Sequence, residues 1–151
     1  MHGIAYDTIV VVPEIVIDTN VLVAALRSTR GASHGLLRLI DSGRFGVNIS
    51  VPLVLEYEDA AKRAIGGMHL AVEDVDDVLD YLCRVARRHA VFYLWRPFLR
   101  DPKDDMLLEV AVVANCNFIV TYNRRDFQGA EQFGVRAVTP REFLRGIGEL
   151  P

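Results

Sequence analysis

The stretch that most constrains the fold of this chain is residues 15–23, with the sequence IVIDTNVLV. Its first half is a short β-branched apolar run, which is typical of a buried strand in a parallel sheet. The run stops at Asp18, Thr19 and Asn20, residue types that begin helices, and an apolar helical pattern follows at once. Because ligands bind beyond the carboxyl ends of strands in open α/β sheets, we expect Asp18 at a binding edge. Alone, an Asp here is better explained as a strand-end or capping residue.

The alternation of strand and helix patterns continues to the end of the chain. We expect strands at residues 14–18, 45–50, 90–95, 117–121 and 135–138. We expect helices at residues 19–27, 34–41 (with Ser33 as the N-cap), from about 52 to 66, and at 72–88, 104–114 and 140–146. This order predicts a single α/β domain over residues 14–151, with a parallel sheet and helices on both faces. Residues 1–13 form an N-terminal extension whose role the sequence leaves open: an edge strand, a dimer arm or a tail.

Composition narrows the class of protein. Hydrophobic residues make up 51% of the 151 residues, which predicts a well-cored globular domain and excludes wholesale disorder. The net charge of −3 gives no global basic field, so a nucleic-acid partner would have to be held by local clusters of Arg and Lys. Cys83 and Cys116 lack metal-ligand spacing and are expected to be reduced core residues. With no signal-like or membrane-length segment, we expect a cytoplasmic protein without a membrane partner.

Acidic residues recur where the predicted strands end. Asp18 ends the first strand, and Glu56 lies in the early turns of the helix after the second. Asp104 and Asp105 open the helix before the fourth strand, Asp126 follows that strand, and Asn123 lies between. Each of these taken singly is well explained by helix capping or by the helix dipole.

Taken together, the acids predict a cation site. Two like charges about 4 Å apart repel by roughly 4 kcal/mol at an effective dielectric near 20, so gathered carboxylates take up protons or bind a cation. Oxygen ligands without Cys or clustered His select Mg²⁺ or Mn²⁺ over Zn²⁺. Beside a backbone phosphate, such an ion can activate water and stabilise a leaving oxygen. The chemistry that we infer is metal-assisted hydrolysis of a nucleic acid.

Four blocks resemble the PIN domain: IDTNVL at 17–22, VLEY at 54–57, DPKDDMLLEVA at 101–111 and IVTYNRRDF at 119–127. Their order and spacing are similar to the toxin components of toxin–antitoxin systems, relatives of VapC. The resemblance implies a three-layer α/β/α sandwich with a five-stranded parallel sheet. It also implies ribonuclease activity that depends on one or two Mg²⁺ or Mn²⁺ ions.

The resemblance also assigns roles to individual residues. Asp18, Glu56 and Asp105 match the family's three central acids, with Asp104 as an adjacent extra acid. Thr19 or Asn20 would orient Asp18 by hydrogen bonding, and Thr121 would line the pocket. Many relatives carry Asp where this chain has Asn123, so the fourth ligand would be the Asn123 carbonyl or the Asp126 carboxylate, and a second metal stays open.

Basic residues near the same edge are candidates for contacts with RNA. Arg100, Lys103, Arg124 and Arg125 are expected in loops there, although simple solvation explains Arg124 and Arg125 equally well. Arg84, Arg87 and Arg88 are better explained as a solvated face, and Tyr122 as either a base-stacking ring or a partly buried strand end. From the resemblance we also expect a homodimer and an antitoxin that blocks the acidic edge.

Two other interpretations stay open at this stage. With Asn123 in place of an acid, the chain can be a catalytically degenerate PIN-fold module for binding RNA or a protein. A phosphotransfer fold is the second alternative. A haloacid-dehalogenase-like domain, however, needs a second Asp where Asn20 stands, and no receiver-type phosphoacceptor and Lys are evident.

Overall fold

A single parallel sheet forms the centre of the molecule. The computed structural model describes residues 11–91 and 98–150. Within these residues five strands are paired in the order β3-β2-β1-β4-β5, and every pair is parallel. The strands are β1 (Glu14–Ile17), β2 (Gly46–Ile49), β3 (Arg87–Arg88), β4 (Phe118–Val120) and β5 (Arg136–Val138). The predicted α/β fold with a parallel sheet is confirmed.

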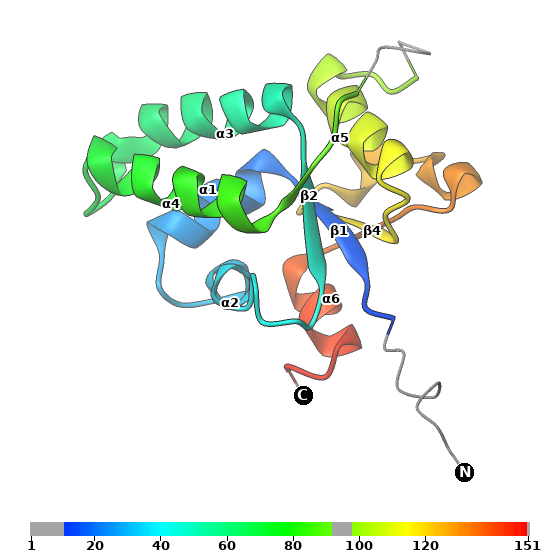
Figure 1. The fold of residues 1–151 in the computed structure, drawn as a ribbon, viewed down its shortest axis with the longest axis horizontal. Helices are drawn as coiled ribbons and strands as arrows, with labels where there is room; N and C mark the ends of the chain where they lie inside the picture. The colour runs from blue at the N-terminus through cyan, green and yellow to red at the C-terminus, as the bar shows by residue number, and fades with distance from the viewer. Residues whose placement is uncertain (1–10, 92–97, 151) are drawn as a thin grey trace.

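Helices cover both faces of this sheet, which gives three layers (Figure 1). One side carries α1 (Thr19–Arg27), α2 (Ala32–Arg38), α3 (Val51–Ala64) and α4 (Val72–Val85), and α6 (Pro140–Gly146) packs next to α2. The other side carries α5 (Pro102–Val113), which contacts β1, β2 and β4. Short 3-10 turns complete the chain: η2 (Ile65–Gly67), η3 (Arg124–Phe127) and η4 (Ala130–Phe133).

The central strands are apolar because both of their faces are covered. Ile15, Val16 and Ile17 of β1 are at most 3% exposed, and Ile119 and Val120 of β4 are fully buried. Burial on both faces explains the continuous β-branched runs that mark these strands in the sequence. The carboxyl ends of β1 and β4 therefore lie next to each other, held in register by pairing from Ile15 with Phe118 to Ile17 with Val120.

Caps fix where the helices begin at this edge. The Ser50 hydroxyl accepts the N–H of Leu53 (3.3 Å) at the start of α3, where Pro52 occupies the first turn. The Asp101 carboxylate accepts the N–H of Lys103 (2.9 Å) and is the N-cap of α5. The predicted start of this helix at residue 104 is therefore two residues late, because Asp101 and Pro102 together begin it.

Three other predicted boundaries are wrong. Ser33 lies inside α2, whose N-cap is Gly31, and the Ser33 hydroxyl bonds to the hydroxyl of Tyr122. The same helix ends at Arg38 and not at residue 41. The helix predicted over 72–88 ends at Val85, since the chain turns extended at Ala86 and residues 87–88 pair with β2.

The third strand consequently lies earlier than expected. It is formed by Arg87 and Arg88, both exposed, at the edge of the sheet. Of the predicted strand over 90–95, residues 90 and 91 are not in a strand and the rest lie outside the described residues. Residues 1–10 of the predicted N-terminal extension also lie outside them.

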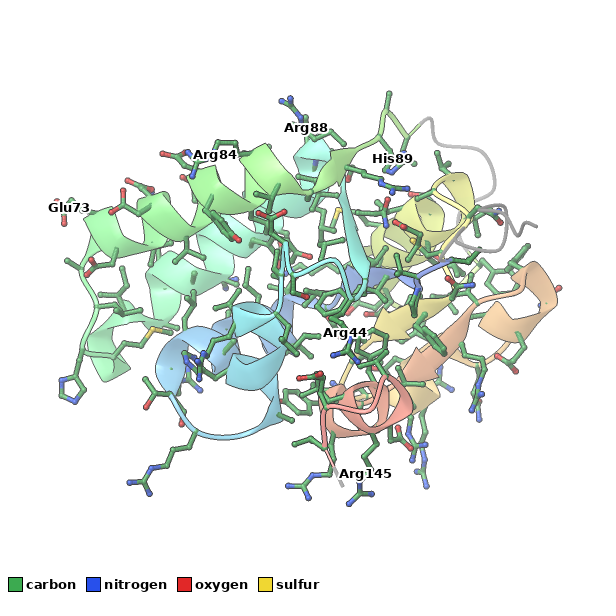
Figure 2. All side chains as sticks on the ribbon, turned by 60° about the horizontal axis from the view of Figure 1, so that its bottom comes forward. Arg44, Glu73, Arg84, Arg88, His89 and Arg145 are labelled. Carbon is green, nitrogen blue, oxygen red and sulfur yellow. The ribbon has the colours of Figure 1, made fainter. Side chains whose placement is uncertain are left out.

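Three features bear on the expected class of protein. Arg84 and Arg88 point outward from α4 and β3, as expected of a solvated face (Figure 2). No helix in the described ranges is long and apolar enough to cross a membrane. Cys83 and Cys116 are free thiols, and Cys116 is buried.

Candidate active site

A polar cleft of about 240 Å³ opens at the carboxyl edge of the sheet. The starts of α3 and α5 lie side by side above this edge (Figure 1). The side chains that line the cleft come from the end of β1, the start of α1, α3, the start of α5 and the loop after β4. They are Asp18, Thr19, Asn20, Glu56, Ala60, Arg63, Asp101, Lys103, Asp104, Leu107, Asn123 and Asp126.

Asp18 is held rigidly at the floor of the cleft. Its backbone N–H donates to the carbonyl of Val120 (2.9 Å), which continues the pairing of β1 with β4. The Thr121 hydroxyl donates to Oδ2 of Asp18 (2.7 Å), and the backbone N–H of Asn123 donates to the same hydroxyl oxygen (3.0 Å). Asp18 is 7% exposed and Thr121 fully buried, so Thr121 supports Asp18 from behind and does not itself line the cleft.

Burial raises the pKa of the Asp18 carboxyl above its usual value. The Thr121 hydroxyl and the backbone of Thr19 and Asn20 oppose this effect by stabilising the ionised form. Thr19 and Asn20 thus act on the Asp18 carboxylate through their backbone. The negative charge of Asp126 raises the pKa of Asp18 further.

Tyr57 connects α3 to the same strand end. Its side chain is fully buried, and its hydroxyl donates to the carbonyl of Ile17, the residue before Asp18. Burial, followed by the charge of Asp18, raises the pKa of this phenol, so it remains a hydrogen-bond donor. The bond fixes α3 over the end of β1 and places Glu56 at the cleft. In the sequence Tyr57 is marked only as the last residue of the VLEY block, with no sign of this bond.

Of the two adjacent acids at the start of α5, the cleft contains Asp104. The pKa of the Asp104 carboxyl is raised from 3.8 to about 7, first by burial and then by the charges of Asp101, Asp18, Asp126 and Asp105. Four carboxylates thus act on this one, which is the electrostatic signature of a site short of positive charge.

Asp105, which the resemblance matches to a central acid, points elsewhere. It is 1% exposed and does not line the cleft. Its Oδ1 accepts the N–H of Leu99 (2.8 Å) and the N–H of Phe98 (3.3 Å). The carboxylate of Asp105 therefore anchors the loop that precedes α5.

Glu56 has a basic neighbour within the cleft. Its Oε1 lies 3.3 Å from Nζ of Lys103, and the Glu56 side chain is 18% exposed while that of Lys103 is 60% exposed. Lys103 is thus at the predicted edge, next to the acids. Asn123 and Asp126 are exposed residues that reach the cleft from the loop after β4.

The donor set of this cleft fits a hard divalent cation. Its acids and one amide, Asp18, Glu56, Asp104, Asp126 and Asn123, offer only oxygen, which Mg²⁺ and Mn²⁺ prefer. In the part of the chain that the structure describes, no three Asp, Glu, His or Cys side chains are close enough together to form a ready-made metal site. The donors are therefore of the type that the ion prefers, but their carboxylates are not close enough together to form a complete site.

A second cleft, of about 550 Å³, adjoins the first. Its lining shares Asp101, Asp104 and Asp126 with the acidic cleft and adds Phe98, Leu99, Arg100, Arg125 and Gln128. Two of the predicted RNA-contacting residues, Arg100 and Arg125, are thus brought together beside the acids.

The remaining basic and aromatic candidates lie outside both clefts. Arg124 forms an ion pair with Glu142 (3.1 Å). Arg87 of the edge strand β3 pairs with Glu14 of β1 (3.3 Å). Tyr122 is 48% exposed, with its hydroxyl bonded to that of Ser33. The structure therefore separates the basic residues that face the acids from those that do not.

A parallel α/β sheet with a cleft lined by oxygen donors at its carboxyl edge defines a class of proteins that bind ligands at this place. The sequence matches the PIN domain family over residues 14–125, which is most of the chain. The chain therefore belongs to the PIN-domain family, whose members are generally nucleases.

The fold is also similar to that of a solved structure. The match is to a chain in the crystal structure of VapBC2 from Rickettsia felis bound to a DNA fragment from their promoter, with a TM-score of 0.58 and 15% sequence identity. The alignment covers 82% of this chain and 98% of that chain. The three-layer PIN-like fold that the sequence predicts is confirmed. A search of the curated proteins found no match.

Proposed function

We propose that this protein is an endoribonuclease that depends on Mg²⁺ or Mn²⁺ and hydrolyses RNA phosphodiester bonds. The observation that carries the proposal is the acidic cleft itself. Asp18, which Thr121 holds in place, lines the same cleft as Glu56, Asp104 and Asp126. Such a cleft repels a phosphate unless a cation is present, and membership of a family of nucleases makes a phosphodiester the substrate to expect.

Asp18 and Asp104 would hold one ion, with Glu56 and the Asn123 carbonyl as further ligands. When bound, the ion polarises the phosphate and lowers the pKa of an attacking water. The rigid support of Asp18 orients its carboxylate before any ligand arrives. Asp126, exposed at the mouth of the cleft, accepts the proton of the attacking water.

The resemblance assigns the role of a central acid to Asp105, whereas we propose that Asp104 has this role. Asp104 lines the cleft, and burial together with four neighbouring carboxylates raises its pKa. The carboxylate of Asp105 instead accepts backbone N–H groups. Asp105 acts on the site by holding the loop from Phe98 to Asp101 and through the effect of its charge on the pKa of Asp104. Lys103, Arg100 and Arg125 supply positive charge for the phosphates that flank the scissile bond.

Cleavage of a mixed panel of RNAs by purified protein with Mn²⁺ or Mg²⁺ tests this proposal. We expect cleavage that disappears with EDTA and in Asp18→Asn and Asp104→Asn. Asp77→Asn, an exposed acid on α4, is the matched control and should cleave normally. Cleavage that persists in EDTA, or in both cleft variants, would contradict the proposal.

Two observations favour a second candidate. Asn123 replaces an expected acid, and Lys103 already supplies Glu56 with a positive charge (3.3 Å), so the cleft can exist without a metal. The protein would then be a catalytically inactive PIN-fold module that binds RNA or a protein. Calorimetric titration with Mn²⁺ separates the two candidates, because only the nuclease requires Asp104-dependent binding of the ion.

We further propose that the protein is the toxin of a toxin–antitoxin pair and acts as a homodimer in the cytoplasm. Support comes from the fold match to a chain of VapBC2, which in that crystal structure is bound to a DNA fragment from their promoter. The excess of carboxylates in the cleft suits an antitoxin that inserts a Lys or Arg among them. Co-expression with the product of the adjacent gene should give a stable complex in which RNA cleavage is lost.

A further inference from the structure

The larger cleft beside the acids has a lining of mixed chemistry that metal binding does not explain. It offers an aromatic ring from Phe98, two guanidinium groups from Arg100 and Arg125, and an amide from Gln128. Its volume of about 550 Å³ falls within the range of roughly 300–1,000 Å³ that is usual for small-molecule sites. An apolar ring, cations and a neutral hydrogen-bonding group together match the parts of a nucleotide.

One wall of this cleft is held in place by several contacts. The Asp105 carboxylate accepts the N–H groups of Leu99 (2.8 Å) and Phe98 (3.3 Å). The Phe98 ring meets the ring of Phe133 edge to face, with centroids 5.2 Å apart. Gly129 has φ +95°, and a Cβ there would lie 3.3 Å from the Phe98 ring, so a side chain at 129 would crowd it. A wall ordered in this way loses little entropy when a ligand binds.

The position of the cleft fixes which part of a ligand meets the acids. Asp101, Asp104 and Asp126 line both clefts, so they form the boundary between the two. A nucleotide whose base fills the larger cleft therefore places one of its phosphates at the acidic cleft. Arg100 and Arg125 stand on the other side of that boundary, where the next phosphate along the strand needs positive charge.

We propose that the larger cleft is a subsite for one unpaired nucleotide of single-stranded RNA, directly beside the scissile phosphate. Phe98 contacts the base, the Gln128 amide bonds to the base edge, and Arg100 and Arg125 hold the flanking phosphate. A base within a duplex has its edge and both faces occupied and cannot enter. The inference rests on the proposed ribonuclease function, since the acidic cleft supplies the reacting centre.

Binding of a fluorescein-labelled, eight-nucleotide RNA to the Asp18→Asn protein tests the subsite without cleavage. The probe is measured by anisotropy as a single strand, as a duplex, and as a set in which each base in turn is removed. We expect one position at which loss of the base weakens binding about tenfold, and weaker binding of the duplex. Gln128→Leu should change which base is preferred at that position, and Gln132→Leu, outside the cleft, should not.

The charged side of the subsite has its own control. Arg125→Gln should weaken binding of every probe and lower its dependence on salt, whereas Arg141→Gln on α6 should do neither. If no single base matters and Gln128→Leu changes nothing, the base subsite is overturned even when the wild type cleaves RNA. If the base-dependent position is found but the wild type with Mn²⁺ does not cleave, the subsite stands and the nuclease proposal falls. A folded protein that binds no probe overturns both.

Discussion

The hydroxyl of Thr121 donates to Oδ2 of Asp18 across 2.7 Å and so joins the ends of β4 and β1 through their side chains. The same hydroxyl oxygen accepts the N–H of Asn123 (3.0 Å), so one buried Thr orients an acid and a loop at once. The cleft therefore owes its geometry to residues that do not line it.

Replacing Thr121 should reduce activity without removing any ligand. In Thr121→Val the Asp18 carboxylate loses its donor, and we expect RNA cleavage or Mn²⁺ affinity to fall by roughly 10–100-fold, as is usual when the partner of a metal ligand is removed. Thr121→Ser keeps the hydroxyl and should retain most of the activity. Full activity in Thr121→Val, or equal loss in both variants, would contradict a role that belongs to the hydroxyl.

Substitutions of the acids at the start of α5 should differ clearly in their effect on the free energy of unfolding. Asp105→Ala leaves the N–H groups of Leu99 and Phe98 without their acceptor in a buried place, and we expect a loss of roughly 2–4 kcal/mol in the free energy of unfolding. Asp101→Ala removes only a cap and should cost about 1 kcal/mol. Asp104→Asn should cost nothing at low pH and should stabilise the fold near neutral pH, because it removes a carboxyl whose pKa is raised in the folded protein. Urea denaturation in EDTA gives all three values, and a large cost for Asp104→Asn would reverse the assignment of the two acids.

The raised pKa of Asp104 predicts a dependence of stability on pH. Its carboxyl has a pKa of about 7 when folded against 3.8 ordinarily, so the folded protein keeps a proton that the unfolded chain has lost. The stability that this group contributes is therefore present below about pH 4 and falls as the pH rises to about 7. Relative to Asp104→Asn, the wild type in EDTA should lose stability over that range, whereas Asp77→Asn should follow the wild type. Parallel curves for wild type and Asp104→Asn would show that the pKa is not raised.

Lys103 competes with a cation for Glu56 and also faces the predicted path of RNA. In Lys103→Met we expect Mn²⁺ to bind more tightly, since Glu56 no longer has a positive neighbour. RNA should bind more weakly, and the slope of log affinity against log salt should fall by about one. Lys62→Met, which removes the pairs with Glu58 and Asp76 away from the cleft, is the control. Unchanged Mn²⁺ affinity would show that Lys103 does not oppose the ion.

Much of the fold could be predicted because its strongest signals are local. The buried runs of β1 and β4 are apolar on both faces. Ser50 and Thr139, which cap α3 and α6, are residue types typical of helix N-caps. The edge strand β3 could not be predicted at its true position, because Arg87 and Arg88 are exposed and carry no apolar pattern. Pairing with Asn48 and Ile49 of β2, distant in the sequence, defines it.

Within the site too, local sequence signals do not show which side chains face the cleft. The sequence brings the right segments together, but whether Asp104 or Asp105 faces the cleft depends on where α5 begins. The dipeptide Asp101-Pro102 is a helix-start signature that sets this point, and reading the helix from residue 104 hides it. The role of Tyr57 could not be recognised from its neighbours on α3, since its hydroxyl partner, the carbonyl of Ile17, lies on β1 and 40 residues earlier in the sequence.

The most direct measurement of the central claim is the anomalous scattering of Mn²⁺ in crystals of the wild-type protein. We predict a peak in the acidic cleft in contact with the carboxylates of Asp18 and Asp104, and its disappearance in Asp104→Asn. A folded protein that shows no peak in the cleft at saturating Mn²⁺, or a peak that is unchanged in Asp104→Asn, would contradict the assignment of this cleft as a metal-dependent nuclease centre.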